Sequence, residues 1–223
     1  VQRNFQVDSV QIEAAIFLDA TITSTVNLTG QVGMMQVKLQ LNNEIPAGGR
    51  ITITFPTTIA FLSNVRLLNA PDMELITVYP KSVNGTLWGS GFADAALRDG
   101  CRVTGTTMQD VPCLVITTHV KRDAGSDLQF HVTDLRMPTV AKNGSIGPVM
   151  VVSLQQDSQE DFIPIDQIKD LSFKAVFPNV FSGLLAQVTS DIAAEETDLT
   201  LSFTSFNVIE VEGFIVISLP LSY

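Results

Sequence analysis

Positive charge is scarce in this sequence. Its 223 residues include 13 Lys and Arg against 23 Asp and Glu, a formal net charge of −10, and the isoelectric point is about 4.5. Such a chain is repelled by the phosphate backbone and by anionic lipids, so we expect no nucleic-acid partner. Long apolar runs are also missing: none approaches the ~18 residues needed to cross a bilayer, and we expect no membrane insertion.

Groups that commonly carry catalysis are few. The two histidines, His119 and His131, lie on predicted strands, and no Gly-x-Ser-x-Gly motif occurs. The glycines of "PAGGR" (46–50) fit a hairpin turn, where they supply positive φ, better than a phosphate-binding loop. We therefore expect neither an enzyme nor a cofactor. A glycan hydrolase, the enzymatic alternative, would need two convergent carboxylates in a cleft.

Acidic residues gather in two stretches that look like solvated loops, the pair Glu195 and Glu196 and the segment "DSQEDFIPID" (157–166). Calcium is the metal that carboxylates of the second stretch could bind, although their spacing departs from the EF-hand loop. The side chains concerned are Asp157, Glu160, Asp161 and Asp166. The prediction for this sequence is no metal site.

What the sequence does have is the composition and periodicity of strands. It is 45% hydrophobic and only 16% charged. Val, Ile, Thr and Phe, of which there are 13, are prominent, and these residue types favour strands. Apolar residues alternate with period two in segments separated by turn-rich text such as "VNGT" and "KNGS". These segments are Val10 to Ile16, Val37 to Leu41, Ile51 to Phe55, Leu114 to Ile116 and Leu128 to Val132, with a more continuous run from Val149 to Leu154. We expect an all-β protein, an antiparallel Ig-like or Greek-key β-sandwich, with at most a short helix between Gly91 and Gly100.

One stretch of the sequence recurs in order. "VNLTGQVGMMQVKLQL" (26–41) aligns without gaps to "VTSDIAAEETDLTLSF" (188–203) at a spacing of 162. After a two-residue adjustment, Ile45 to Pro56 aligns to Ile209 to Pro220 at a spacing of 164, and "VQIEAAIF" (10–17) matches "LSFKAVFP" (171–178) in apolar pattern. A period of this length is that of a whole domain rather than a solenoid repeat. We expect a complete sandwich at 1–163 and a partial second repeat at 164–223, homologous to about 1–60.

A partial sandwich exposes an apolar face and an unpaired strand edge, so something must complete it. We expect a neighbouring copy of the chain to do so, in head-to-tail contacts that build a filament. The N-terminal segment Val1 to Ile16 is the expected donor. The side chains expected at the interface are Val10, Ile12, Ile16, Leu199, Leu201, Phe203, Ile215, Ile217 and Leu219.

Three motifs are specific enough to compare with known families: "LQLNNEIPAGGRITITFP", "CRVTGTTMQDVPCLVITT" and "DLQFHVTDLRMPTVAKNGSIGPVMVVS". They resemble the repeated domains of large extracellular surface proteins of microbial eukaryotes, and the similarity spans roughly 30–170 with a partial return at 185–220. Met137, where that family more often has Asn, and Glu210, in place of Pro, depart from its pattern. The resemblance implies a tandem-repeat architecture and an extracellular or cell-surface location.

The two cysteines, Cys101 and Cys113, stand in β-like text separated by a segment that can fold back as a hairpin. In an extracellular chain an even count of two predicts one disulfide, which the central disulfide hairpin of the resembled family also implies. Two buried free thiols in a cytosolic protein are the alternative.

Three N-glycosylation sequons begin at Asn27, Asn84 and Asn143, and N-linked glycans are expected if the chain is secreted by a eukaryote.

Two function classes follow. The first is a structural subunit of an extracellular filament or surface coat, which an incomplete repeat favours. The second is an adhesin whose loops bind a glycan or another cell. Exposed aromatic side chains near carboxylates would favour this class, and Trp88 is the single tryptophan in the sequence.

Overall fold

The computed structural model describes residues 13–62, 64–79, 82–83, 86–87, 112–140, 144–156, 162–190, 192, 196–207, 209 and 214–218. Within these ranges the chain is all-β and contains no helix. Accordingly, no helix among the described residues has the length and apolarity needed to span a membrane. The predicted fold class, an antiparallel β-sandwich, is confirmed. The helix considered at 91–100 lies outside the described residues.

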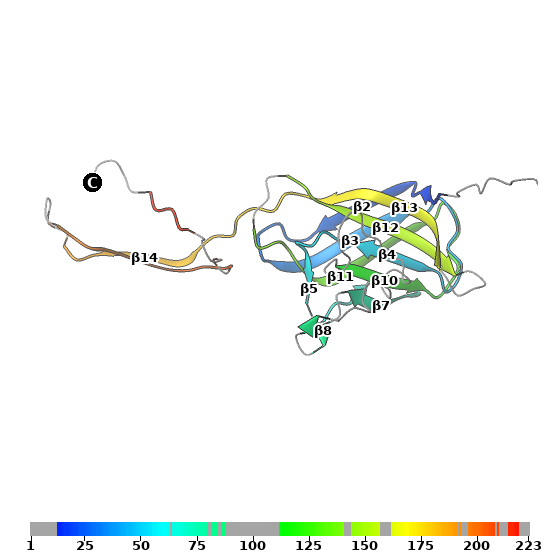
Figure 1. The fold of residues 1–223 in the computed structure, drawn as a ribbon, viewed down its shortest axis with the longest axis horizontal. Coiled ribbons are helices and arrows are strands. Elements are labelled where there is room, and N and C mark those ends of the chain that lie inside the picture. Colours follow the sequence, from blue (N-terminus) through cyan, green and yellow to red (C-terminus); the bar gives the residue numbers. More distant parts are fainter. Residues whose placement is uncertain are drawn as a thin grey trace, which may run out of the picture.

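Two sheets face one another in the sandwich (Figure 1). The first has six strands in the spatial order β1 (Ala15–Ile16), β13 (Phe162–Phe173), β12 (Ile146–Gln156), β4 (Arg50–Thr54), β10 (Cys113–Thr118) and β7 (Met73–Tyr79). The second has the order β2 (Asp19–Ser24), β3 (Val32–Gln40), β11 (Asp127–Arg136) and β5 (Ala60–Phe61), with β6 (Leu67–Leu68) also pairing with β11. Two hairpins stand apart, β8 (Ser82–Val83) with β9 (Thr86–Leu87), and β14 (Ser182–Val188) with β15 (Leu199–Thr204). Among these strands only β1 and β13 pair in parallel.

Alternation in the sequence places one face of each strand in the core. On β3 the inward residues are Met35, Val37 and Leu39, all buried. Their partners on β11 continue the same face, because Val37 lies opposite Phe130 and Leu39 opposite Leu128. From the other sheet Ile51, Ile53, Leu114 and Ile116 close the core. The predicted strands at 37–41, 51–55, 114–116, 128–132 and 149–154 are therefore confirmed.

The central strands of the six-stranded sheet are buried on both faces. On β12 the side chains of Val149 and Val151 point into the main core, while Val152 and Leu154 belong to a second, smaller apolar cluster. A strand buried on both sides needs apolar residues at successive positions. This explains why 149–154 is apolar at every position except the buried Ser153, rather than alternating.

The first unit extends further along the chain than the sequence predicted. β13 spans the boundary expected between residues 163 and 164, pairs with β12 along its length, and buries Phe173 in the core. Val176 is buried there too. The sandwich thus includes residues to about 176, and the 171–178 segment that sequence comparison assigned to a second repeat belongs to the first.

The β14–β15 hairpin extends beyond one end of the sandwich (Figure 1). The first described residues, dark blue in Figure 1, lie toward the opposite end, where β1 pairs with β13. The molecule is therefore elongated, with the sandwich and the β14–β15 hairpin one after the other along its long axis.

Candidate functional site

The β14–β15 hairpin has one apolar face. Ala186 lies opposite Leu201 and Val188 opposite Leu199, so these side chains project to the same side of the ribbon. The side chains on that face are Leu184, Ala186, Val188, Leu199, Leu201 and Phe203. The opposite face carries Leu185, Gln187, Thr200, Ser202 and Thr204. This is the pattern of a sheet that packs against a second layer on one side.

No second layer covers that face among the described residues. Leu184 is 69% exposed and Leu199 is 42% exposed. One aromatic contact exists, between the rings of Phe181 and Phe203 at 4.7 Å between centroids. Most of the large apolar side chains that are exposed in the described part of the chain lie beyond residue 176. An apolar surface of this kind marks an interaction site.

The pairing of β14 with β15 reproduces that of β2 with β3 at a spacing of 164 residues. The Thr25 N–H donates to the Met34 carbonyl (2.9 Å), and the Met34 N–H donates to Thr25 Oγ1 (3.0 Å). At the same spacing the Thr189 N–H donates to the Asp198 carbonyl (3.2 Å), and the Asp198 N–H donates to Thr189 Oγ1 (2.9 Å).

The other ends of the two hairpins agree as well. The Leu18 N–H donates to the Gln40 carbonyl, and the counterpart of Leu18, Ser182, lies opposite Thr204. The pairings from Leu185 to Val188 thus have a spacing of 164, not the 162 that the alignment of 26–41 used, and the register shifts between Ser182 and Leu185. Because the two values differ by an even number, both place the same strand face inward.

Burial is what separates the two hairpins. Met35 and Val37 are fully buried. The counterpart of Met35, Leu199, is exposed, and the counterpart of Val37, Leu201, is half-buried. In the first unit the covering layer includes Ile51 and Ile53 of β4, which pairs with both β10 and β12.

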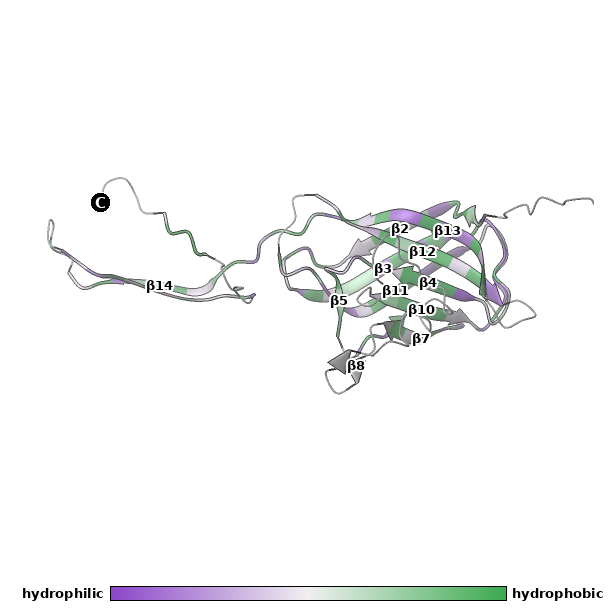
Figure 2. Ribbon diagram, viewed as in Figure 1, coloured by the Kyte–Doolittle hydropathy of each residue, from purple (hydrophilic) through white to green (hydrophobic). Residues whose placement is uncertain are grey.

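The counterpart of β4 is the segment 214–218, which is apolar but not a strand. Figure 2 shows this segment, red in Figure 1, in the hydrophobic colour. Phe214 is 85% exposed, and Ile215 and Ile217 are exposed as well. A central strand needs a hydrogen-bonding neighbour on each side, and none of the described residues pairs with 214–218.

A polar cluster fastens the start of the hairpin to the sandwich. The side chain of Thr29 is only 3% exposed, and its Oγ1 accepts hydrogen bonds from the Asn179 N–H (3.0 Å) and from Asn207 Nδ2 (2.8 Å). The Phe177 carbonyl accepts a further bond from the Thr29 N–H (2.9 Å). Sequence reasoning missed this cluster, although Asn207 has a signal: it stands 164 residues after Asn43.

Asn43 takes part in a second polar cluster. Asp166 on β13 is fully buried, and its carboxylate accepts hydrogen bonds from the N–H groups of Asn42 and Asn43 (3.1 Å each) and from Asn43 Nδ2 (2.8 Å). Asp166 was one of four residues considered for calcium, and here its oxygens bind protein donors instead. The other three lie outside the described residues. The described residues contain no group of three or more side chains that could bind a metal ion.

Cys113 is the first residue of β10 and is buried. The described part of the chain contains no free cysteine. Its predicted partner, Cys101, lies outside the described residues, so the Cys101–Cys113 pairing stays a prediction.

Of the three sequons, only the first is described. Asn27 is exposed in the loop between β2 and β3, rather than on a strand as its sequence context indicated. Asn84 and Asn143 lie outside the described residues. Glycosylation at all three sites stays a prediction.

The predicted interface residues fall into three groups. Val10, Ile12 and Leu219 lie outside the described residues. Leu199, Leu201, Phe203, Ile215 and Ile217 belong to the hairpin and the segment after it. Ile16 is 67% exposed on β1, where its backbone pairs with Gln167 of the same chain. The structure thus brings the C-terminal members together and leaves Ile16 at the other end of the sandwich.

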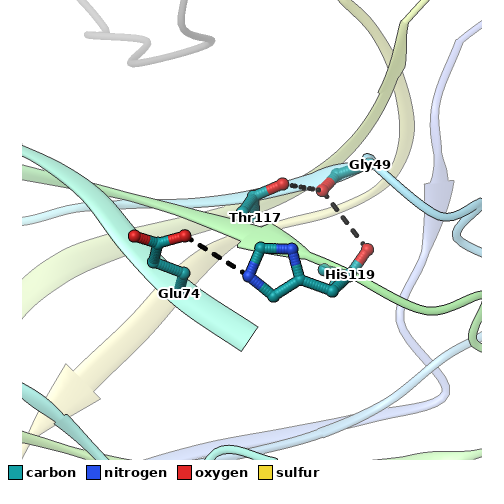
Figure 3. Close-up of polar contacts among 5 residues, drawn as sticks. Gly49, Glu74, Thr117 and His119 are labelled. Carbon is teal, nitrogen blue, oxygen red and sulfur yellow. Dashed lines mark hydrogen bonds and ion pairs between the residues drawn. The ribbon is translucent and has the colours of Figure 1, made fainter. Parts of the chain in front are cut away.

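Among the described residues, each histidine contacts one polar side chain. His119 follows β10, and its Nε2 lies 3.3 Å from Glu74 Oε2 of β7, with both side chains exposed (Figure 3). His131 lies on β11 in the other sheet, where its Nδ1 is 3.1 Å from Asn69 Nδ2. These are surface contacts, and the absence of enzymatic activity stays a prediction.

Comparison with known proteins gives distant structural likeness only. No family model and no curated protein matches the chain. A Corynebacterium diphtheriae protein described as membrane anchored is similar over 72% of this chain, with 12% identity and a TM-score of 0.34; the match covers 36% of that protein, so this chain spans about a third of it. The third cohesin ScaC of Acetivibrio cellulolyticus, solved with the ScaB dockerin, is similar over 72% of this chain and 96% of the cohesin, with 13% identity and a TM-score of 0.29. Likeness at this level carries no information on function.

Proposed function

We propose that the chain is a structural subunit of an extracellular filament or surface coat, in which sandwich units follow one another head to tail. The observation that carries the proposal is the β14–β15 hairpin, which repeats the pairing of β2–β3 and leaves its apolar face uncovered. In this account the apolar face of the hairpin is covered by a neighbouring copy.

Energetics support completion. An isolated two-stranded hairpin is marginally stable in water, and burying about six such side chains is worth on the order of 10 kcal/mol. The hairpin and the first described residues lie at opposite ends of the sandwich (Figure 1). A contact between two different ends is head to tail, and such contacts build filaments unless they close into a ring.

The extracellular location rests on two further parts of the proposal. One is a disulfide between Cys101 and Cys113, which the absence of a free cysteine among the described residues supports. The other is N-linked glycan at Asn27, Asn84 and Asn143, for which the exposure of Asn27 is favourable. Both features would suit a coat protein that works outside the cell.

Sedimentation velocity of the full chain over a range of concentrations tests the proposal. We expect a series of oligomers that grows with concentration. Leu201→Asp, on the apolar face, should abolish the series, whereas Ser202→Asp, one residue away on the polar face, should leave it intact. A wild-type chain that stays monomeric at every concentration would overturn the proposal.

A further inference from the structure

Both strands of the β14–β15 hairpin are tied to one buried residue of the sandwich, Thr29. Before β14, the Asn179 N–H donates to Thr29 Oγ1 (3.0 Å), and Asn179 Nδ2 donates to the Thr29 carbonyl (3.4 Å). After β15, Asn207 Nδ2 donates to the same Oγ1 (2.8 Å). The hairpin is thus held where the chain enters it and where the chain leaves it. A ribbon held at both strands cannot swing about a single covalent connection.

The next residue, Gly30, leaves the space in which the Asn207 side chain lies. Gly30 has a φ of +67°, a conformation that favours glycine, and its N–H donates to the Pro138 carbonyl (2.9 Å), which fixes this loop to the sandwich. A Cβ added at Gly30 would clash with Asn207 Oδ1 and would lie 3.1 Å from its Cγ. A side chain at position 30 would therefore push the Asn207 amide away from Thr29.

The first hairpin is anchored in the same way. Asn43 stands 164 residues before Asn207 and follows β3 as Asn207 follows β15. Its Nδ2 donates to Asp166 Oδ1 at 2.8 Å, the same length as the bond from Asn207 to Thr29. In each hairpin, an asparagine after the second strand thus donates its side-chain amide to a buried residue of the sandwich.

We propose that Thr29 and Gly30 form a socket for the Asn207 side chain, and that this socket sets the direction in which the hairpin extends from the end of the sandwich (Figure 1). All of its bonds lie within one chain, so the socket acts in a monomer and does not depend on the proposed function. Where copies assemble, a fixed direction of the hairpin would give successive contacts the same geometry.

Single-molecule FRET on the full chain tests the socket at picomolar concentration, where copies do not meet. One dye is attached through Lys38→Cys, at an exposed position of β3, and the other through Thr200→Cys, at an exposed position of β15, under non-reducing conditions. We expect one narrow FRET population for this labelled parent chain. Asn207→Ala should raise the fraction of molecules outside that population about fivefold, the change that corresponds to one lost hydrogen bond.

Gly30→Ala should have the same effect, because the added Cβ displaces the Asn207 amide. Gly125→Ala is the matched control: its φ of +78° strains an alanine in the same way, but beyond its chain neighbours no atom lies within 4 Å of the added Cβ. This control should leave the FRET population unchanged. The double variant Gly30→Ala/Asn207→Ala should be no broader than either single variant, since both substitutions remove the same contact.

Amide hydrogen exchange at low protein concentration distinguishes a hairpin that turns from one that unfolds. Thr189 and Asp198, at the far end of the hairpin, bond to each other and not to the socket, so their amides should keep their protection in every variant. Loss of that protection in Asn207→Ala would overturn the proposal, because the socket would then hold the hairpin together rather than direct it. A broad FRET population in the parent chain, or one that Asn207→Ala leaves unchanged, would overturn it as well.

Discussion

Two hairpins in this molecule share their pairing and differ in their surroundings. β2–β3 and β14–β15 share their register from Leu185 to Val188 of β14. In each hairpin the first strand is followed by a threonine whose backbone and hydroxyl both bond across the strands. Met35 is nonetheless fully buried, and its counterpart Leu199 is exposed. The comparison teaches that the same strand pairing occurs with its apolar face covered or uncovered, because the strands that cover it come from elsewhere in the fold.

The largest difference between the hairpins should appear on truncating counterpart residues. Met35→Ala removes a fully buried side chain and should lower the free energy of unfolding by about 2–5 kcal/mol. Leu199→Ala at the matching position should change it by less than about 1 kcal/mol, because the side chain has little cover to lose. Urea denaturation monitored by circular dichroism measures both. Equal losses would mean that the hairpin face is already covered in the monomer.

A second effect concerns the buried carboxylate near the first end of the sandwich. Asp166→Ala would leave three N–H donors from Asn42 and Asn43 without a partner and should cost about 2–3 kcal/mol. Asp170→Ala, on the exposed part of the same strand, should have little effect. The thermal unfolding midpoint reports both variants. An unchanged midpoint for the first would show that these donors are satisfied without the carboxylate.

A smaller effect concerns the attachment of the second hairpin. Thr29→Val removes the hydroxyl that accepts bonds from Asn179 and Asn207, each worth about 1 kcal/mol. We expect the sandwich to remain folded while limited proteolysis between residues 177 and 182 becomes several times faster. Thr23→Val, at an exposed position of β2, should leave the cleavage rate unchanged. If β2–β3 resists cleavage in both variants, the effect of Thr29→Val is confined to the attachment of the second hairpin.

Periodicity alone predicted much of the sandwich. The alternation in β3, β4 and β11 and the continuous run in β12 reflect burial on one face or on two, which sequence records directly. β2, with the sequence "DATITS", went unpredicted because an edge strand with polar outward residues has only two apolar positions in six. The strand β7 is continuous, but its pairing with β10 shifts between Val115 and Ile116, and a shift of this kind disturbs the alternation.

The two polar clusters could not be predicted for a different reason. Asp166 is a charged residue that is fully buried, against the usual preference, because loop N–H groups from more than 100 residues away surround it. Thr29 is joined to Asn207 over a similar distance in sequence. Such contacts depend on how segments meet in the fold.

The domain boundary was misplaced because the apolar pattern of 171–178 fits the end of one unit as well as the start of the next.

Amide hydrogen exchange along β15, measured at low and high protein concentration with β3 as an internal reference, tests the central claim most directly. If a neighbouring copy covers the second hairpin, protection of Leu199, Leu201 and Phe203 should rise with concentration toward that of Met35, Val37 and Leu39, which should not change. Protection of β15 that stays low at every concentration, while β3 remains protected, would contradict completion of the hairpin by another copy.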